Sequence, residues 1–252
     1  MIQSSEGKGG LFSGNERLNR SSMSGEPERM APLARRQSLQ AQAYQALRSA
    51  ILSGEITSGT RLVETQLAKQ LQVSRTPIRE AIRQLQQENL ITIDTAGTLR
   101  VATLSMQDAV QLYTCRIALE QLSVVGACEN ATDKEIAALQ DLVVAAEQTD
   151  RSQSTNAHLL NLDYQFHRSI ARSSKNLWLT SLLDQVFDQM ALLRIQTLQR
   201  NPQVLEIRQE HREIYSAIAS RNREKAVDTI VSHLSASRDR VIREIERLRQ
   251  ET

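Results

Sequence analysis

Apolar residues recur at helical spacing along most of the chain, while two short runs have the composition of strands. In the segment 38–52, Tyr44, Leu47 and Ile51 lie three and then four residues apart, which predicts a helix with one apolar face. The pattern predicts three helices, at residues 38–52, 64–72 and 75–85. It also predicts a hairpin of two short strands, at residues 90–93 and 99–102. These are the elements of a winged helix-turn-helix.

The third predicted helix, residues 75–85, has basic residues opposite its apolar positions. Arg75, Arg79 and Arg83 lie four residues apart and so share one helical face. Ser74 precedes the helix and can cap it through its side-chain oxygen. A basic face backed by an apolar face suits a DNA groove, although most isolated Arg-rich helices are solvated surface helices. The neighbouring helices and hairpin favour DNA binding.

From residue 105 onward the pattern predicts helices and no strand. Capping boxes that begin at Ser105 and Thr132 mark two helix starts. Further breaks delimit six helices of roughly 15 to 30 residues, and they fall near Asn130, Asp150, Ser173, Asn201 and Ser220. We expect an all-α antiparallel bundle. In its last helix Arg240 and Glu244 are expected on the solvated outer face.

The first 36 residues hold five of the nine glycines and six serines, and this composition predicts a disordered tail. The fold is therefore expected to be mainly α, in three parts. These parts are a tail over 1–36, a winged helix-turn-helix over 37–104 and an all-helical bundle over 105–252.

Charge is distributed unevenly between these parts. The whole chain has a net charge of only +2, which by itself would not indicate nucleic acid. Residues 1–103 hold 13 Lys and Arg against 9 Asp and Glu, a net +4, and residues 104–252 hold 18 against 20, a net −2. The basic excess thus coincides with the helix-turn-helix, as neutralisation of DNA phosphates requires.

Cysteine content and hydropathy suggest an intracellular protein. Cys115 and Cys128 lie 13 residues apart in one predicted helix and cannot pair, so we expect buried, reduced thiols. No apolar run reaches the roughly 20 residues of a membrane helix, and no signal peptide is visible. We therefore expect a cytoplasmic location and no contact with a membrane.

All four histidines lie in the second half of the chain. Asp163 and His167 are four residues apart, so their side chains project about 40° apart on one helical face. With His211 and His233 from later helices, they would form a set that suits a divalent metal such as zinc or nickel. Histidines that are hydrogen-bonded separately are the simpler alternative. His158 projects to the opposite face and is expected at the surface.

The DNA-binding segment resembles the GntR family of bacterial transcription regulators. The resemblance covers about residues 38–103 and rests on four runs, Gly59–Glu64, Leu67–Ala68, Val73–Ala81 and Glu88–Ile91. It implies DNA contacts from the recognition helix and its start, and entry of the wing into the minor groove. The expected DNA-binding residues are Thr65, Ser74, Arg75, Thr76, Arg79 and Gly97. Thr65 stands where some members have a base-contacting arginine, which suggests a different operator sequence.

The second half, about residues 107–245, resembles the FCD ligand-binding domain of the FadR-type branch of that family. The resemblance rests on Asp163 with His167, on Asn176, on the run Glu210–Ile214 and on His233. It implies that Asp163, His167, His211 and His233 hold a divalent metal ion, zinc or nickel, at the floor of a pocket. Six expected helices are closer to the VanR-like subgroup than to FadR, so acyl-CoA is not the expected effector.

The resemblance implies a small carboxylate, a sugar acid or a dicarboxylate as the effector, with a carboxylate oxygen bound to the metal. Arg116 and Arg194 are candidate second anchors, because a guanidinium group binds a carboxylate through two hydrogen bonds. An ion pair between Arg116 and Glu120, four residues later, explains the first arginine equally well. An exposed position is the alternative for Arg194.

These features predict a DNA-binding transcription regulator rather than an enzyme, and the family resemblance implies that it is a repressor. It would act in a bacterial cytoplasm, associated with the nucleoid, as a homodimer on a near-palindromic double-stranded operator. Two alternatives stay open. One is a metal-dependent hydrolase fused to a DNA-binding domain, and the other is a regulator in which the metal is purely structural.

Overall fold

The computed structural model describes residues 38–149, 156–198 and 208–250. The tail predicted over residues 1–36 lies outside these ranges. Where the structure describes the chain, it is mainly α, with one small antiparallel sheet, as the sequence predicts.

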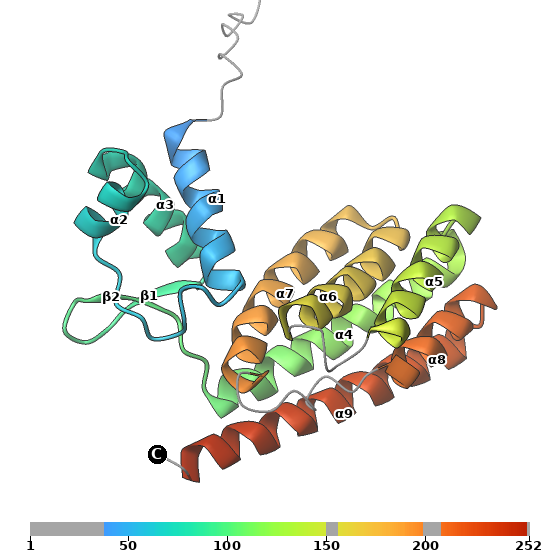
Figure 1. The fold of residues 1–252 in the computed structure, drawn as a ribbon. Coiled ribbons are helices and arrows are strands. Elements are labelled where there is room, and N and C mark those ends of the chain that lie inside the picture. The colour runs from blue at the N-terminus through green and yellow to red at the C-terminus, as the bar shows by residue number, and fades with distance from the viewer. Residues whose placement is uncertain (1–37, 150–155, 199–207, 251–252) are drawn as a thin grey trace, which may run out of the picture. The chain divides into compact units, whose positions relative to one another are not determined.

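The first part of the described chain is a winged helix-turn-helix (Figure 1). Its elements are α1 (Leu39–Leu52), α2 (Glu64–Gln70), α3 (Arg75–Gln87), β1 (Ile91–Ile93) and β2 (Leu99–Val101). The strands pair antiparallel, with Ile91 opposite Val101. Leu47 and Ile51 of α1 pack in one core with Ile78 and Leu85 of α3, so these apolar faces meet as their periodicity predicts.

The expected side-chain cap at the start of α3 is wrong. Ser74 occupies the N-cap position with an extended backbone, but its side chain makes no capping hydrogen bond. The hydroxyl is exposed at the beginning of the recognition helix. A backbone position that suits a cap therefore does not by itself fix the side-chain rotamer that makes the bond.

The second part contains six helices within the described residues (Figure 1). They are α4 (Met106–Asn130), α5 (Asp133–Gln148), α6 (Asn156–Ser173), α7 (Leu177–Leu198), α8 (Arg208–Ala219) and α9 (Arg223–Gln250). The capping boxes of α4 and α5, at Ser105 and Thr132, are both formed. Helix α4 packs along α9 and also contacts α6 and α7, so it lies at the centre of the bundle.

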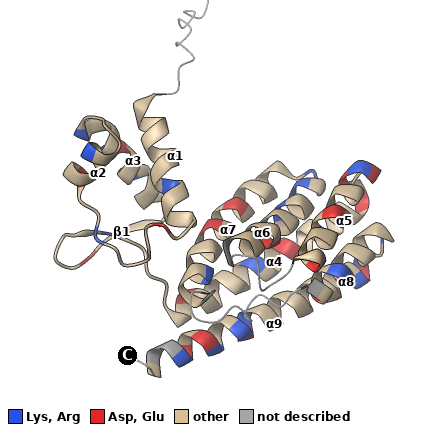
Figure 2. Ribbon diagram, in the orientation of Figure 1, with Lys and Arg blue, Asp and Glu red and all other residues tan. Residues whose placement is uncertain are grey.

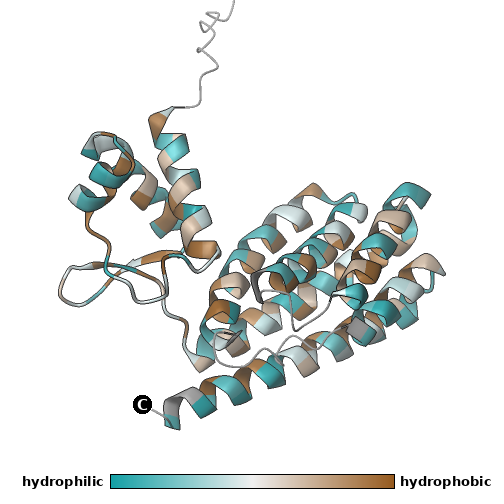
Figure 3. Cartoon of the chain, viewed as in Figure 1, coloured by the Kyte–Doolittle hydropathy of each residue, from teal (hydrophilic) through white to brown (hydrophobic). Residues whose placement is uncertain are grey.

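Apolar and polar positions alternate around the bundle helices (Figure 3), and the apolar faces build the core. Val124 of α4, Phe166 and Ile170 of α6, and Ile230 and Leu234 of α9 belong to one buried cluster. This core holds α4, α6 and α9 in fixed register. It thereby fixes the polar side chains that the same helices turn inward.

Two surface expectations are wrong. Cys115 is exposed, and only Cys128 is buried. In α9 Glu244 is buried rather than solvated, and Arg240 hydrogen-bonds to Glu210 of α8 at 2.9 Å. Both errors arise because single-helix patterns do not show which neighbouring helix covers a face. Among the described helices, none is long and apolar enough to cross a membrane.

Candidate metal centre

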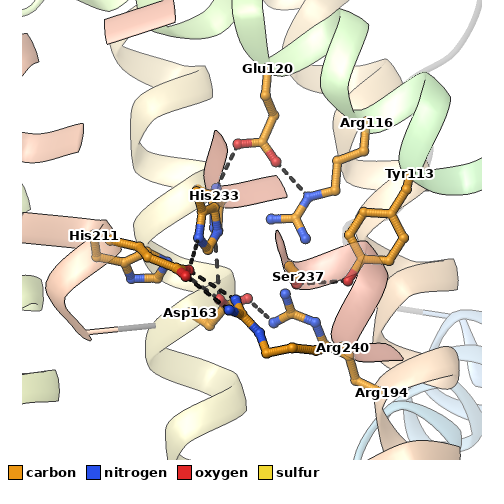
Figure 4. Close-up of polar contacts among 11 residues, drawn as sticks. Tyr113, Arg116, Glu120, Asp163, Arg194, His211, His233, Ser237 and Arg240 are labelled. Carbon is orange, nitrogen blue, oxygen red and sulfur yellow. Dashed lines mark hydrogen bonds and ion pairs between the residues drawn. The ribbon is translucent and has the colours of Figure 1, made fainter. Parts of the chain in front are cut away.

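Four buried side chains from three helices converge inside the bundle. Asp163 and His167 come from α6, His211 from α8 and His233 from α9. One possible ligand atom from each residue lies within 4.8 Å of those of the other three. Figure 4 shows Asp163, His211 and His233 directed toward one another. The structure thus brings together the set of four residues that the sequence suggested.

Packing of the neighbouring apolar side chains directs the four candidate metal ligands toward the interior of the bundle. Phe166 and Ile170, which flank the polar face of α6, are fully buried, so Asp163 and His167 face the interior with them. The ring of Phe166 stacks on His211, with centroids 4.2 Å apart and planes 19° apart. This stacking fixes the plane of the His211 imidazole.

The outer nitrogens of two imidazoles are held by carboxylates. His167 Nδ1 lies 2.6 Å from Glu120 Oε2, and His233 Nδ1 lies 2.7 Å from Glu210 Oε2. An ionised carboxylate only accepts hydrogen bonds, so each Nδ1 carries the proton. Each Nε2 then presents a lone pair to the centre of the cluster. Carboxylates that orient histidines in this way are typical outer-sphere partners of metal sites.

The inward atoms lack the partners that burial demands. The Nε2 atoms of His167 and His233 lie 3.2 Å apart, so their lone pairs face each other unless a cation or proton lies between them. Asp163 Oδ1 and His211 Nε2 are buried without a hydrogen-bond partner. Buried polar atoms without a partner are costly. The three imidazole nitrogens and one carboxylate oxygen are donors suited to divalent zinc or nickel, and a bound ion would give each of them a partner.

The electrostatic environment keeps three of these donors, Asp163, His211 and His233, in the protonation states that metal binding requires. Burial lowers the pKa of His211 well below its usual value and, with neighbouring positive charge, lowers that of His233 to about 4. Burial alone would raise the pKa of Asp163, but the positive charge of Arg194 lowers it instead. At neutral pH the histidines His211 and His233 are therefore neutral and Asp163 is ionised, as metal binding requires.

Sequence reasoning missed the two orienting carboxylates. The sequence indicates Glu120 only as an ion-pair partner for Arg116, and Glu210 only as part of the run Glu210–Ile214. Burial opposes ionisation of both, yet neighbouring positive groups and hydrogen bonds lower their pKa values to about 2. The adjacency of Glu210 and His211 gave no signal, because Glu210 bonds to His233 on another helix.

A cavity of about 560 Å³ adjoins the cluster, and Asp163 and His167 form part of its wall. Arg116 and Arg194 line it as well. Arg116 makes the ion pair within α4 that its spacing from Glu120 predicts, with 2.6 Å between Arg116 Nε and Glu120 Oε1. Arg116 also lines the cavity.

Arg194 is buried rather than exposed. Its side chain is 4% exposed, and its Nη1 donates to Asp163 Oδ2. Its Nη2 has no hydrogen-bond partner. A buried guanidinium N–H without an acceptor, on a residue that lines a cavity, is suited to an acidic ligand that reaches it.

The predicted DNA-contacting residues are gathered in the helix-turn-helix and its wing, and all are exposed. They are Thr65 on α2, Ser74, Arg75, Thr76 and Arg79 at the start of α3, and Gly97 in the hairpin. Gly97 has a φ of 76°, which favours glycine, and a Cβ there would meet nothing within 4 Å. The wing tip is therefore narrow and open.

One acidic residue organises the recognition arginines. Glu64 Oε2, at the start of α2, accepts hydrogen bonds from Arg75 Nη2 at 2.9 Å and from Arg79 Nε at 2.8 Å. Arg83 pairs separately with Glu80 of its own helix, at 2.8 Å. Figure 2 shows basic and acidic positions on α2 and α3. The role of Glu64 had no signal in the sequence, because it precedes Arg75 by 11 residues.

Comparison with known families matches both parts of the chain. Residues 39–101 match bacterial regulatory proteins of the gntR family, and residues 111–236 match the FCD domain. The chain belongs to the GntR family of transcription regulators.

A GntR relative in Bacillus subtilis (strain 168), the uncharacterized HTH-type transcriptional regulator YdhC, is 31% identical over 194 residues. The alignment covers 77% of this chain and 87% of that protein. The gluconate operon transcriptional repressor of Bacillus licheniformis is 40% identical over 74 residues, which are 29% of this chain and 30% of that one. These relatives are transcription regulators, so this GntR protein is a regulator and not an enzyme.

The same architecture occurs in a solved structure of Escherichia coli McbR/YncC. The match has a TM-score of 0.69 and 23% sequence identity, and it covers 79% of this chain and 95% of that one. At this identity the likeness shows the fold. That fold is a GntR helix-turn-helix followed by a helical FCD domain.

Proposed function

We propose that this GntR regulator is a repressor whose operator binding is controlled by a small carboxylate or sugar acid, bound beside a metal ion. The observation that carries the proposal is the inward-facing, unsatisfied donor set next to an arginine-lined cavity. A purely apolar cavity would not select an acid, and a fully hydrogen-bonded histidine cluster would not need a metal.

Asp163, His167, His211 and His233 are the residues that would hold the ion, with zinc or nickel best suited to three imidazoles and one carboxylate. When bound, the ion supplies a Lewis-acidic site for a carboxylate oxygen of the effector. Glu120 fixes the ring orientation of His167 through its Nδ1 proton, and Glu210 does the same for His233. These bonds keep the Nε2 lone pairs directed inward.

Arg116 and Arg194 bind the acidic group of the effector. The free Nη2 of Arg194 is the strongest support, because burial has removed that donor from water without giving it a partner. Three arginines and two aspartates line the cavity, so its wall is positive before any metal charge is added. An anionic ligand therefore gains electrostatic energy on entry.

The recognition helix α3 contacts the operator in the major groove. Arg75, Thr76 and Arg79, at the exposed N-terminal end of this helix, make these contacts. Ser74 and Thr65 contact DNA beside it, and Gly97 brings the wing into the minor groove. The pairing of Arg75 and Arg79 with one carboxylate supports this assignment, because it holds two flexible guanidinium groups in a fixed arrangement.

The protein acts as a homodimer on a near-palindromic operator, in the cytoplasm where bacterial DNA lies. Support comes from large apolar side chains that are exposed on α4 and α7, two helices that pack together. They are Leu122, Leu177, Trp178 and Leu182, with Trp178 83% exposed. Large apolar groups exposed on neighbouring helices are suited to an interface with a second copy of the chain. Trp178→Ser should shift the protein from dimer to monomer in analytical ultracentrifugation, and a monomeric wild type would contradict the assignment.

The regulatory proposal is tested with zinc-loaded protein and DNA from upstream of its own gene. Fluorescence anisotropy measures operator affinity with and without a panel of small carboxylates and sugar acids. A member of the panel should weaken operator binding by up to about a hundredfold. If no acid binds, the effector class is wrong.

The same measurements separate a regulatory metal from a structural one. Removal of the metal by a chelator should abolish acid binding as well as lower the melting temperature. A lower melting temperature with unchanged acid affinity would instead assign the metal a structural role.

A further inference from the structure

The cavity beside the candidate metal centre is not enclosed by the FCD helices alone. Helix α1 of the DNA-binding domain forms part of its wall, through Gln45, Arg48 and Ser49. The cavity therefore extends from Asp163 and His167 to the first helix of the winged helix-turn-helix. A ligand that fills it touches both functional parts of the chain.

One ion pair crosses this cavity wall. Arg48 of α1 donates through Nη2 to Asp188 Oδ2 of α7, and both residues line the cavity. Asp188 is 13% exposed and Arg48 is 28% exposed, so water reaches the arginine more freely. Burial raises the pKa of Asp188 despite the positive charge of Arg48. The pair is thus partly exposed at the cavity, where an acidic ligand can compete with Asp188 for Arg48.

Helix α1 packs against the recognition helix α3 in a shared apolar core. Leu47, one residue before Arg48, and Ile51 pack in the same buried core as Ile78 and Leu85 of α3. Leu192 of α7 is 1% exposed and belongs to this core as well. A change of partner at Arg48 therefore acts on a helix that packs directly on α3.

We propose that Arg48 binds a second acidic group of the effector, and that its exchange from Asp188 to the ligand couples the cavity to the DNA-binding domain. This inference rests on the proposed effector function and narrows it. The effector is an acid with two anionic groups, one at the metal and Arg194 end of the cavity and the other at α1. A monocarboxylate would reach only the first of these ends.

The test is calorimetric titration of zinc-loaded protein with dicarboxylates of increasing length, from malonate to adipate, and with butyrate as the monocarboxylate. Wild type should prefer one length of dicarboxylate over butyrate. Arg48→Gln should weaken binding of the preferred dicarboxylate about tenfold or more, as loss of a charge-assisted hydrogen bond predicts, and leave butyrate binding unchanged. Equal affinity of Arg48→Gln and wild type for that dicarboxylate would overturn the inference.

Asp188→Asn supplies a result of opposite sign. It removes the carboxylate that competes for Arg48, so the affinity for the preferred dicarboxylate should rise. If the ion pair only stabilised the fold, Arg48→Gln and Asp188→Asn would change affinity in the same direction. The matched control is Arg168→Gln, because Arg168 pairs with Asp184 one turn earlier on α7, at 2.6 Å, and neither residue lines the cavity.

Hydrogen exchange tests the coupling without an operator. The preferred dicarboxylate should change the exchange rates of amides in α1 in wild type and in Arg168→Gln, but not in Arg48→Gln. Unchanged exchange in wild-type α1 would overturn the coupling. If wild type binds no acid of the series, the proposed effector class fails as well. If wild type binds a dicarboxylate and Arg48→Gln binds it equally, only the role of Arg48 fails.

Discussion

His167 and His233 face each other across the bundle interior, with their Nε2 atoms 3.2 Å apart. The Nδ1 atom of each ring lies against a carboxylate, so neither ring can turn its proton inward without losing that partner. Two lone pairs at this separation repel unless a positive charge lies between them. The arrangement therefore favours a bound cation.

Loss of a proposed ligand should abolish metal binding. His211→Ala removes one imidazole that is buried beside Asp163, with 3.5 Å between His211 Nε2 and Asp163 Oδ1. Zinc affinity should fall by more than the roughly 10- to 100-fold typical of an outer-sphere change. The control is His158→Ala, because His158 is an exposed histidine on α6 and should not alter zinc content. Elemental analysis after dialysis gives the result, and full zinc retention in His211→Ala would refute the site.

Glu210 is expected to act as a positioning residue. Glu210→Gln should weaken zinc binding roughly 10- to 100-fold, because a neutral amide holds the Nδ1 proton of His233 less strongly. The visible spectrum of cobalt-substituted protein separates this role from a loss of stability, because the spectrum depends on the geometry of the metal ligands. Glu210→Asp should restore part of the affinity. Glu213→Gln, an exposed change on the same helix, is the control, and an unaltered cobalt spectrum in Glu210→Gln would contradict the role.

Arg79 should contribute to specific operator binding, and Arg83 should not. Both are exposed on α3, but only Arg79 is held against Glu64, while Arg83 pairs with Glu80. Arg79→Ala should cost about 1–3 kcal/mol of operator affinity, the usual value of a base contact. Gel-shift titrations against operator and unrelated DNA measure this loss. Equal effects of Arg79→Ala and Arg83→Ala would show that α3 contributes charge only.

Glu64 should set specificity rather than affinity for DNA in general. Glu64→Gln frees Arg75 and Arg79 from a shared acceptor and removes a negative charge near the DNA phosphates. Binding to unrelated DNA should strengthen, because electrostatic attraction rises, while preference for the operator falls. The ratio of the two dissociation constants at fixed salt gives the answer. An increased ratio in favour of the operator would contradict the positioning role.

The capping box of α5 should make the free energy of unfolding depend on pH. Hydrogen bonds from Lys175 and from the Thr132 backbone lower the pKa of Glu135 from 4.5 to about 2. A lowered folded-state pKa stabilises the fold above pH 4.5, and this contribution is lost as the pH falls toward 2. Glu135→Gln should therefore lower the free energy of unfolding at pH 5 more than at pH 3. Urea titrations at both pH values test this, with Thr132→Ser as a control that keeps the cap.

Local pattern alone predicted much of the architecture. The helix-turn-helix and six helices of the second part follow from apolar spacing, caps and breaks, which act over only a few residues. The Asp163 and His167 pair is equally local, since residues four apart share a face of any helix. Its inward direction followed from Phe166 and Ile170 beside it.

Only the tertiary structure decided what those side chains meet. His211 and His233 reach Asp163 because α6, α8 and α9 pack in one particular rotation about their axes, which depends on the whole core. The same packing buried Arg194, which excludes the alternative of an exposed position, and left Cys115 at the surface.

The sequence therefore determined which elements form and which residues could do chemistry, because periodicity and residue type are properties of short segments. The tertiary structure determined partners. It joined Glu210 to His233, Glu64 to Arg79 and Arg48 to the cavity, across separations at which sequence spacing carries no geometric information. Packing of complementary apolar faces is cooperative, so these partners are set by all the helices together.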